Sequence, residues 1–311
     1  MNKTGIEYLT HTWNPTHGCT PISEGCRECW AEGMSKRLAG MGKKGYSKED
    51  PFKPTFCPWK LEEPLRRKKP AVIGVSFMGD LFHGNIPFDL IAAIFGVMSF
   101  CQQHTFIVLT KRACRMAMFF NHHNGDYKSN FNWWLNEACL TLPENMTKGI
   151  RLRPRPDKFP LPNVWLGVSV ESDKYRWRIE ELIKIPGKHF ISYEPALGSL
   201  DVKKYLMPSI TDAMKAPNAR CGHHGNLLHG RACPDCFPNT LNGVIAGCES
   251  GPNRRHAKVE WFRDLKNQCV SARVPFFLKQ MTQPYMFGHQ QKTKVIKMPF
   301  LDGQIWNELP F

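Results

Sequence analysis

The sequence predicts an α/β protein whose parallel strands form either a barrel or a doubly wound sheet. One observation is that short, β-rich apolar runs alternate with helical patterns along the chain. A second is that most of these runs are almost continuously apolar, as expected for strands covered on both faces. A third is that polar residues follow the carboxyl end of each run, where parallel β/α folds place their active sites.

Seven apolar runs are expected to be strands, and helices are expected between them. The strands are residues 8–13, 72–77, 105–109, 164–170, 189–192, 244–246 and 274–278. Pro87 opens an apolar stretch through Phe100 that suits a buried helix. Ser172 is expected to cap a second helix, and an apolar stripe from Trp261 to Cys269 predicts a third.

The length allows about two domains or one large α/β domain with insertions, and we expect a single core-forming domain over residues 1–311. The chain has 42 Lys and Arg against 27 Asp and Glu, a formal charge of +15, and 42% hydrophobic residues. This composition argues against a disordered chain or a coiled coil. No stretch approaches the roughly 18 uninterrupted apolar residues of a membrane span, and the first residues contain no apolar signal-peptide core. We therefore expect a cytoplasmic protein without a membrane partner.

Two stretches interrupt the strand–helix rhythm. Residues 121–160 are too long for an ordinary connection and are expected to form a lid or substrate loop, in which Trp133 and Trp134 could hold a nucleic-acid strand. Residues 208–242 form a second insertion, rich in Cys and His.

The first strand is followed by three closely spaced cysteines, Cys19, Cys26 and Cys29. The spacing C-x6-C-x2-C places two thiols on one tight turn, and the preceding loop brings back a third. Three thiolates can hold a [4Fe–4S] cluster by three corners and leave one iron open. Zinc is the alternative, with His17 or a distant group as fourth ligand. Spacing alone does not choose between the two metals.

The second insertion carries another group of metal-ligand residues, Cys221, His223, Cys233 and Cys236. These four could form a tetrahedral Cys3His zinc site that folds the insertion, and His224 or His229 could replace His223. A second iron–sulfur cluster and unligated thiols are the alternatives. The remaining, scattered cysteines are expected to be small core residues.

Several sequence blocks resemble the radical S-adenosylmethionine enzymes, and more closely a phage-associated family within or beside them. The blocks are TWNPTHGCTPISEGCRECWAEGMSKRL, SFMGDLFH, HTFIVLTKR, PNVWLGVSVES, ISYEPALG, AGCESGPNRR and VPFFLKQ. They extend over most of the chain. The usual first spacing in the superfamily is C-x3-C, and longer first spacings occur.

The resemblance implies a partial (β/α)6 barrel with a [4Fe–4S] cluster on Cys19, Cys26 and Cys29. The open iron would bind S-adenosylmethionine, and an electron from a donor such as flavodoxin would release a 5′-deoxyadenosyl radical. The expected cofactor-binding residues are Ser76, Met78, Asp80, Ser169, Glu171, Glu194, Gly247 and Glu249. The alternative is that Asp80, Glu171 and Glu194 only cap helices and contact no cofactor.

The positive charge favours a polyanionic partner, DNA or a nucleotide. The residues expected to contact this substrate are Lys111, Arg112, Arg254, Arg255, Lys279 and Gln280. The superfamily includes a DNA-repair photoproduct lyase, and phages rebuild thymine bases. The resemblance therefore implies a radical rearrangement on a modified base. For a phage-encoded protein, the reaction would take place in the host cytoplasm. Two alternatives remain: a non-catalytic, zinc-containing nucleic-acid-binding protein, and a radical enzyme for a small metabolite.

Overall fold

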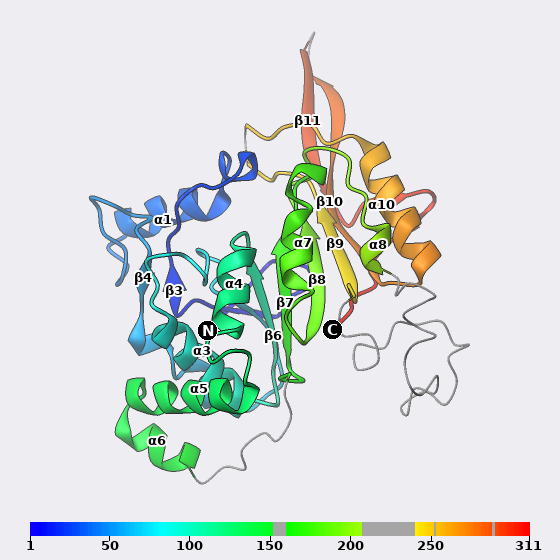
Figure 1. Cartoon of the computed structure of the whole chain (residues 1–311). Coiled ribbons are helices and arrows are strands. Elements are labelled where there is room, and N and C mark those ends of the chain that lie inside the picture. The colour runs from blue at the N-terminus through cyan, green and yellow to red at the C-terminus, as the bar shows by residue number, and fades with distance from the viewer. Residues whose placement is uncertain (152–159, 207–239, 252, 288–289) are drawn as a thin grey trace, which may run out of the picture. The chain divides into compact units, whose positions relative to one another are not determined.

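The computed structural model describes residues 1–151, 160–206, 240–251, 253–287 and 290–311 (Figure 1). The chain divides into two compact units, Met1–Gly167 and Val168–Phe311. The predicted zinc ligands Cys221, His223, Cys233 and Cys236 lie outside the described residues, and so does the end of the predicted lid.

The protein is α/β, with a mostly parallel sheet of nine strands in the order β1-β2-β5-β6-β7-β8-β9-β10-β11. Each of the seven runs expected to be strands contains or overlaps one of these strands. They are β2 (His11–Trp13), β5 (Val72–Val75), β6 (Thr105–Thr110), β7 (Val164–Ser169), β8 (Lys188–Tyr193), β9 (Gly243–Gly247) and β10 (Phe276–Phe287). The predicted class is therefore confirmed, whereas closure of the strands into a barrel is not shown.

In the first unit, β2 pairs in parallel with β5, and β5 pairs in parallel with β6. The short β1 (Asn2–Lys3) pairs antiparallel with β2, and β3 (Thr16–His17) pairs antiparallel with β4 (Thr55–Phe56). The helices of this unit are α1 (Trp30–Gly40), α2 (Glu63–Arg66), α3 (Phe88–Phe100), α4 (Ala113–Phe120), α5 (Tyr127–Thr141) and α6 (Glu144–Arg151). The expected buried helix is α3, whose residues Ile91–Ser99 are all buried.

The described part of the predicted lid, residues 121–151, is mainly helical. The Asp126 side chain caps α5 by accepting hydrogen bonds from the backbone N–H groups of Lys128 and Ser129. α5 packs against α3 (Figure 1), and Trp134 is fully buried, stacked on Phe119 with ring centroids 5.7 Å apart. Trp134 is therefore a core residue, and the expectation that it stacks on a nucleic-acid strand is wrong.

In the second unit, β8, β9 and β10 pair in parallel, and β10 pairs antiparallel with the long β11 (Gln290–Lys297) (Figure 1). The helices are α7 (Trp177–Leu182), α8 (Lys203–Leu206) and α10 (Val259–Ala272). Phe262, Leu265 and Cys269 form the buried face of α10, as the apolar stripe predicts. No helix in the described ranges has the length and apolarity that a membrane crossing requires.

A buried ion pair lies near the start of this unit. Arg178 Nη1 donates to Glu171 Oε2 at 2.7 Å and to the Ser169 carbonyl at 2.8 Å. The two side chains are 1% and 0% exposed. Glu171, expected to contact a cofactor, is thus used inside the protein, and Ser169 supplies its carbonyl to the same arginine.

Removing one member of this pair should strongly destabilise the protein. Glu171→Ala leaves the buried Arg178 guanidinium without its counter-charge, which costs about 3–5 kcal/mol. Urea unfolding followed by circular dichroism measures the loss. Glu181→Ala, which breaks the exposed Lys184–Glu181 pair, is the control and should change stability little. Equal effects of the two substitutions would contradict this assignment.

Candidate functional site: the three-cysteine loop

The three-cysteine loop, residues 19–29, begins just after a point where two segments of backbone lie in very close contact. Gly18 N donates to the Met78 carbonyl at 3.0 Å, and Gly18 forms a parallel bridge with Gly79. A Cβ on Gly79 would lie 2.4 Å from the Gly18 carbonyl oxygen. Gly18 also has a φ of +80°, which L side chains rarely adopt. The two glycines therefore fix where the loop begins.

The three thiols are all half-buried. Cys19 N donates to the Phe52 carbonyl at 3.0 Å, Cys26 ends a short 3-10 turn (Glu24–Cys26), and Cys29 is the N-cap of α1. The C-x2-C pair thus lies between one turn and the first helix.

Two side-chain cations from the end of β6 reach two of these sulfurs. Arg112 Nη1 donates to Cys19 Sγ at 3.2 Å, and Lys111 Nζ donates to Cys26 Sγ at 3.7 Å. Arg112 also donates through Nη2 to the carbonyl of Thr20 at 2.9 Å. Positive charge beside a thiol stabilises the thiolate, the form that binds metal. The sequence predicted Lys111 and Arg112 as substrate contacts, but here they contact the cysteine loop.

Asp80 holds Arg112 in this position. Its carboxylate accepts hydrogen bonds from Arg112 Nη1 at 3.0 Å, Thr110 Oγ1 at 2.6 Å, Lys111 N at 3.2 Å and Phe82 N at 3.0 Å. The residue is 6% exposed. Four donors occupy the sites that a carboxylate offers. Asp80 is therefore a positioning residue, which is a different role from the cofactor contact that the sequence predicted.

Ser76 and Met78 are buried and form hydrogen bonds with residues that precede the loop. The Thr16 hydroxyl donates to Ser76 Oγ at 2.7 Å, and the Asn14 side chain accepts from Met78 N at 3.0 Å. The two residues connect the ends of β2 and β5.

Sequence reasoning missed two members of this network, Thr20 and His83. Thr20 Oγ1 is 2.9 Å from His83 Nε2, and His83 is 5% exposed. His83 Nδ1 accepts from Asn85 N at 3.1 Å. The block SFMGDLFH contains His83, but a single histidine gives no sign of its partner in a loop 63 residues away.

The surroundings of Cys19 and Cys26 shift the pKa values of these two thiols in opposite directions. Burial, assisted by the Asp80 carboxylate, raises the pKa of Cys19 to about 11 despite the opposing Arg112. Burial also acts to raise the pKa of Cys26, but the Lys111 ammonium and hydrogen bonds from the turn outweigh it, so this pKa lies below its usual value.

Cys26 should therefore react with iodoacetamide before Cys19 in metal-free protein at neutral pH. The thiolate is the nucleophile, and the lowered pKa of Cys26 gives it a larger thiolate fraction there than Cys19, whose pKa is raised. Raising the pH toward 11 should narrow the difference, because Cys19 then deprotonates. Peptide mass spectrometry measures the order, and Lys111→Met should slow Cys26. Faster labelling of Cys19 at neutral pH would contradict this order.

In the second unit, the cations predicted to bind substrate are occupied by acids and carbonyls of the same unit. Lys279 Nζ is 2.6 Å from Glu194 Oε1, and Arg255 forms an ion pair with Glu249. Arg254 donates to the carbonyls of Gly251 and Thr293. These pairs reduce the charge available to a phosphate.

Gln280 and Gly247 complete this group. Gln280 Nε2 donates to the Cys248 carbonyl at 2.6 Å, and a Cβ on Gly247 would lie 3.2 Å from the Glu194 carboxylate. A larger residue at position 247 would therefore press on the side chain of Glu194. Nothing in these contacts assigns Glu194, Gly247, Glu249 or Gln280 to a cofactor.

The described ranges contain no group of three or more His, Cys, Asp or Glu side chains already gathered for a metal ion. His17, the alternative zinc ligand, stacks on Tyr46 with ring centroids 4.1 Å apart. A Cβ on Gly45 would lie 3.2 Å from His17 Nε2 and 3.3 Å from Cys57 Sγ, so this imidazole lies beside Cys57. Burial lowers the pKa of His17 to about 4, and the ring is neutral at neutral pH.

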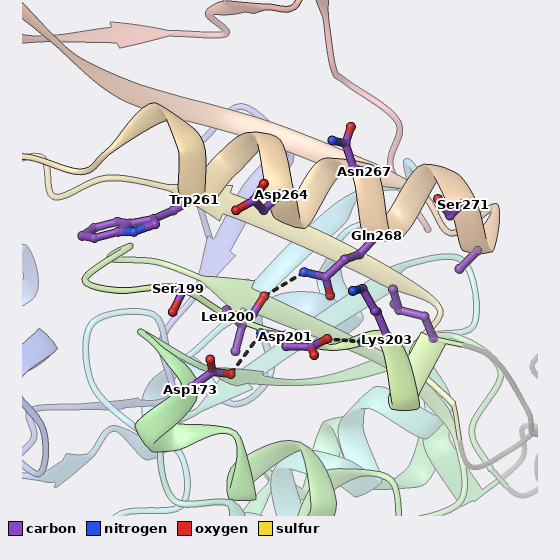
Figure 2. A pocket seen from close by; sticks show the side chains of 12 residues that line it. Asp173, Ser199, Leu200, Asp201, Lys203, Trp261, Asp264, Asn267, Gln268 and Ser271 are labelled. Carbon is purple, nitrogen blue, oxygen red and sulfur yellow. Dashed lines mark hydrogen bonds between the residues drawn. The ribbon is translucent and has the colours of Figure 1, made fainter.

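A cavity of about 550 Å³ lies elsewhere in the second unit. Trp261, Asp264 and Gln268 of α10 line one side, and Leu200, Asp201 and Lys203 line the other (Figure 2). Gln268 bridges the two sides, because its Nε2 donates to the Leu200 carbonyl at 3.0 Å and its Oε1 accepts from Val202 N at 2.7 Å. None of the site residues predicted from the sequence lines this cavity.

Comparison with known proteins corrects the family assignment. No curated protein and no solved structure matches the chain. The one family model found matches residues 3–310, and no radical S-adenosylmethionine family accompanies it. The predicted membership in that superfamily is therefore wrong. The resemblance rested on short motif blocks, whereas the family model matches residues 3–310 and names a different family. The chain belongs to DUF5131, a family described as proteins of unknown function.

Proposed function

We propose that this protein is an enzyme that binds a [4Fe–4S] cluster through Cys19, Cys26 and Cys29 and modifies a nucleobase. The observation that carries the proposal is the pair of cationic donors on two of the three sulfurs, Arg112 on Cys19 and Lys111 on Cys26. This support comes from the thiols and their neighbours and is independent of any superfamily membership.

The residues present fit such a cluster in their chemistry. Thiolates are the ligands of iron–sulfur clusters, and hydrogen bonds to the sulfurs tune the reduction potential. Arg112 and Lys111 supply N–H donors and positive charge where three thiolates would otherwise repel one another. Asp80 fixes the guanidinium, so these donors remain in place when the thiols change their charge.

With three protein ligands, a bound cluster supplies one-electron chemistry at an open iron, the chemistry that reductive cleavage of S-adenosylmethionine requires. A low-potential donor of the flavodoxin type would supply the electron. The chain's own part is to hold the cluster on a loop whose base is fixed by Gly18 and Gly79. The three thiols are half-buried, so each keeps some solvent contact.

The finer parts of the proposal are the barrel and the substrate. Within each unit the parallel strands follow chain order, as they do in β/α barrels, and this order supports a partial (β/α)6 arrangement. The charge of +15 supports DNA or a nucleotide as substrate. We also propose structural zinc at Cys221, His223, Cys233 and Cys236.

Anaerobic reconstitution tests the proposal. Purified protein incubated with iron and sulfide should gain about four of each per chain, and the reduced protein should cleave S-adenosylmethionine. Arg112→Met should lower the cluster's reduction potential, because it removes a cationic donor from Cys19, while Arg27→Met, an exposed arginine on the same loop, should not. Zinc in place of iron would instead favour a zinc-containing binding protein without catalysis.

A further inference from the structure

One stretch of the first unit carries a large share of the positive charge. Residues 36–69, here called the basic segment, contain eleven Lys and Arg against four Asp and Glu. This net charge of +7 is nearly half of the +15 of the whole chain, in about a ninth of its length. Such a local excess attracts polyanions.

The acids of the basic segment leave most of these cations unneutralised. Glu62 pairs with Arg66, Glu63 pairs with the N-terminal amine, and Glu49 accepts from Ser47. Within the basic segment, which the structure describes throughout, six exposed lysines have no ion pair: Lys44, which lies over Trp59, and five others. The five others are Lys43, Lys48, Lys53, Lys68 and Lys69. The contrast with Lys279, Arg254 and Arg255 is direct, because those three are held by acids or carbonyls.

Exposed tryptophans accompany the charge. Trp59 is 40% exposed, and Lys44 Nζ lies 4.3 Å from its ring centroid. Trp30, next to Cys29, is 48% exposed. Large aromatic rings at a basic surface are the usual platform for bases of a single strand, and stacking does not depend on the base.

Backbone contacts join the basic segment to the first residue of the three-cysteine loop and to the residues just before it. Cys57 N donates to the Pro15 carbonyl at 2.7 Å, and Cys19 N donates to the Phe52 carbonyl at 3.0 Å. A Cβ on Gly18 would lie 2.2 Å from the Lys53 carbonyl oxygen. A strand bound on this segment would therefore lie beside the proposed metal site.

We propose that the basic segment is a binding surface for single-stranded nucleic acid, with its lysines on phosphates and Trp59 stacked on a base. This deepens the proposed function, because it names the surface that receives the substrate, and it rests on the nucleic-acid part of that function alone. Binding is expected in the absence of any cluster.

The test is a fluorescence anisotropy titration of the full chain with a labelled DNA strand of about 16 nucleotides, a single-strand site size, at two salt concentrations. Lys43→Glu/Lys48→Glu/Lys53→Glu should weaken binding at least about tenfold and reduce the log–log salt slope by about 2, since each lost phosphate contact contributes about 0.7. Trp59→Ala should weaken single-strand binding at least about fivefold and duplex binding less.

The control variant Lys128→Glu/Lys174→Glu/Lys258→Glu changes the net charge equally at exposed positions outside the basic segment. It should bind like the unsubstituted protein. Equal weakening in the control, undetectable binding, or equally tight binding to anionic lipid vesicles would each overturn the proposal. An RNA strand in the same assay shows which sugar is preferred. If DNA binds but no cluster forms, the cluster proposal fails and this surface stands.

Discussion

Alanine at Cys19, Cys26 and Cys29 together should abolish both iron binding and the cleavage of S-adenosylmethionine. The thiolates are the only protein ligands proposed for the cluster, and a cluster held by three cysteines does not survive their removal. The expected result is the loss of about four iron and four sulfide per chain together with all cofactor cleavage. Iron and sulfide analysis, visible absorption and chromatography of the reaction products measure the two properties.

Cys114→Ala is the matched control, because this thiol is exposed and belongs to α4 of the same unit. It should retain the full iron content and cleavage. A triple variant that still cleaves S-adenosylmethionine would show that the chemistry does not use this loop. A control that loses its iron would show that the effect is not specific to the three cysteines.

Asp80→Ala should destabilise the protein and also disturb the cysteine loop. The substitution leaves the Thr110 hydroxyl and the backbone N–H groups of Phe82 and Lys111 without this acceptor, and it removes the counter-charge of Arg112, which keeps its bonds to Cys19 and Thr20. Asp80 is buried but Arg112 is only half-buried, so the loss should lie below the cost of about 3–5 kcal/mol for a fully buried charge pair. Urea unfolding should show this loss, and Asp50→Ala, at an exposed acid of the same unit, should show little.

A purely structural role for Asp80 would end at stability, whereas a positioning role extends to Cys19. Asp80→Asn keeps part of the hydrogen bonding and should fold, but it removes the charge that holds Arg112. The reconstituted Asn variant should therefore have a shifted reduction potential. A double-mutant cycle with Arg112→Met should show coupling, since the two side chains share one network. Unchanged potential and additive effects would contradict the positioning role.

The parallel strands could be predicted from the sequence because they are buried on both faces. Val164–Ser169 and Gly243–Gly247 are buried at every position, so they read as continuous apolar runs. Helix α5 was missed because its surface residues are polar and its buried face is supplied by few residues, Trp134 and Leu135 among them. Only the packing of Trp134 against Phe95 and Phe119 shows that this segment is core.

The site was predicted in its residue types but not in their roles. The cysteine spacing identifies three thiols, and the polar residues after β5 and β6 identify Asp80, Lys111 and Arg112. The sequence does not show which basic side chain contacts which partner when the two are far apart in the chain. Arg112 reaches Cys19 over a separation of 93 residues, and Lys279 reaches Glu194 over 85. Residues expected to face a ligand therefore include several that neutralise one another.

Anomalous X-ray scattering at the iron and zinc edges, from crystals of anaerobically purified protein, identifies the metal held by the three cysteines. We expect an iron signal within bonding distance of the Sγ atoms of Cys19, Cys26 and Cys29, with one iron lacking a protein ligand. A lone zinc ion at this position, or three free thiols in protein reconstituted with iron and sulfide, would contradict it.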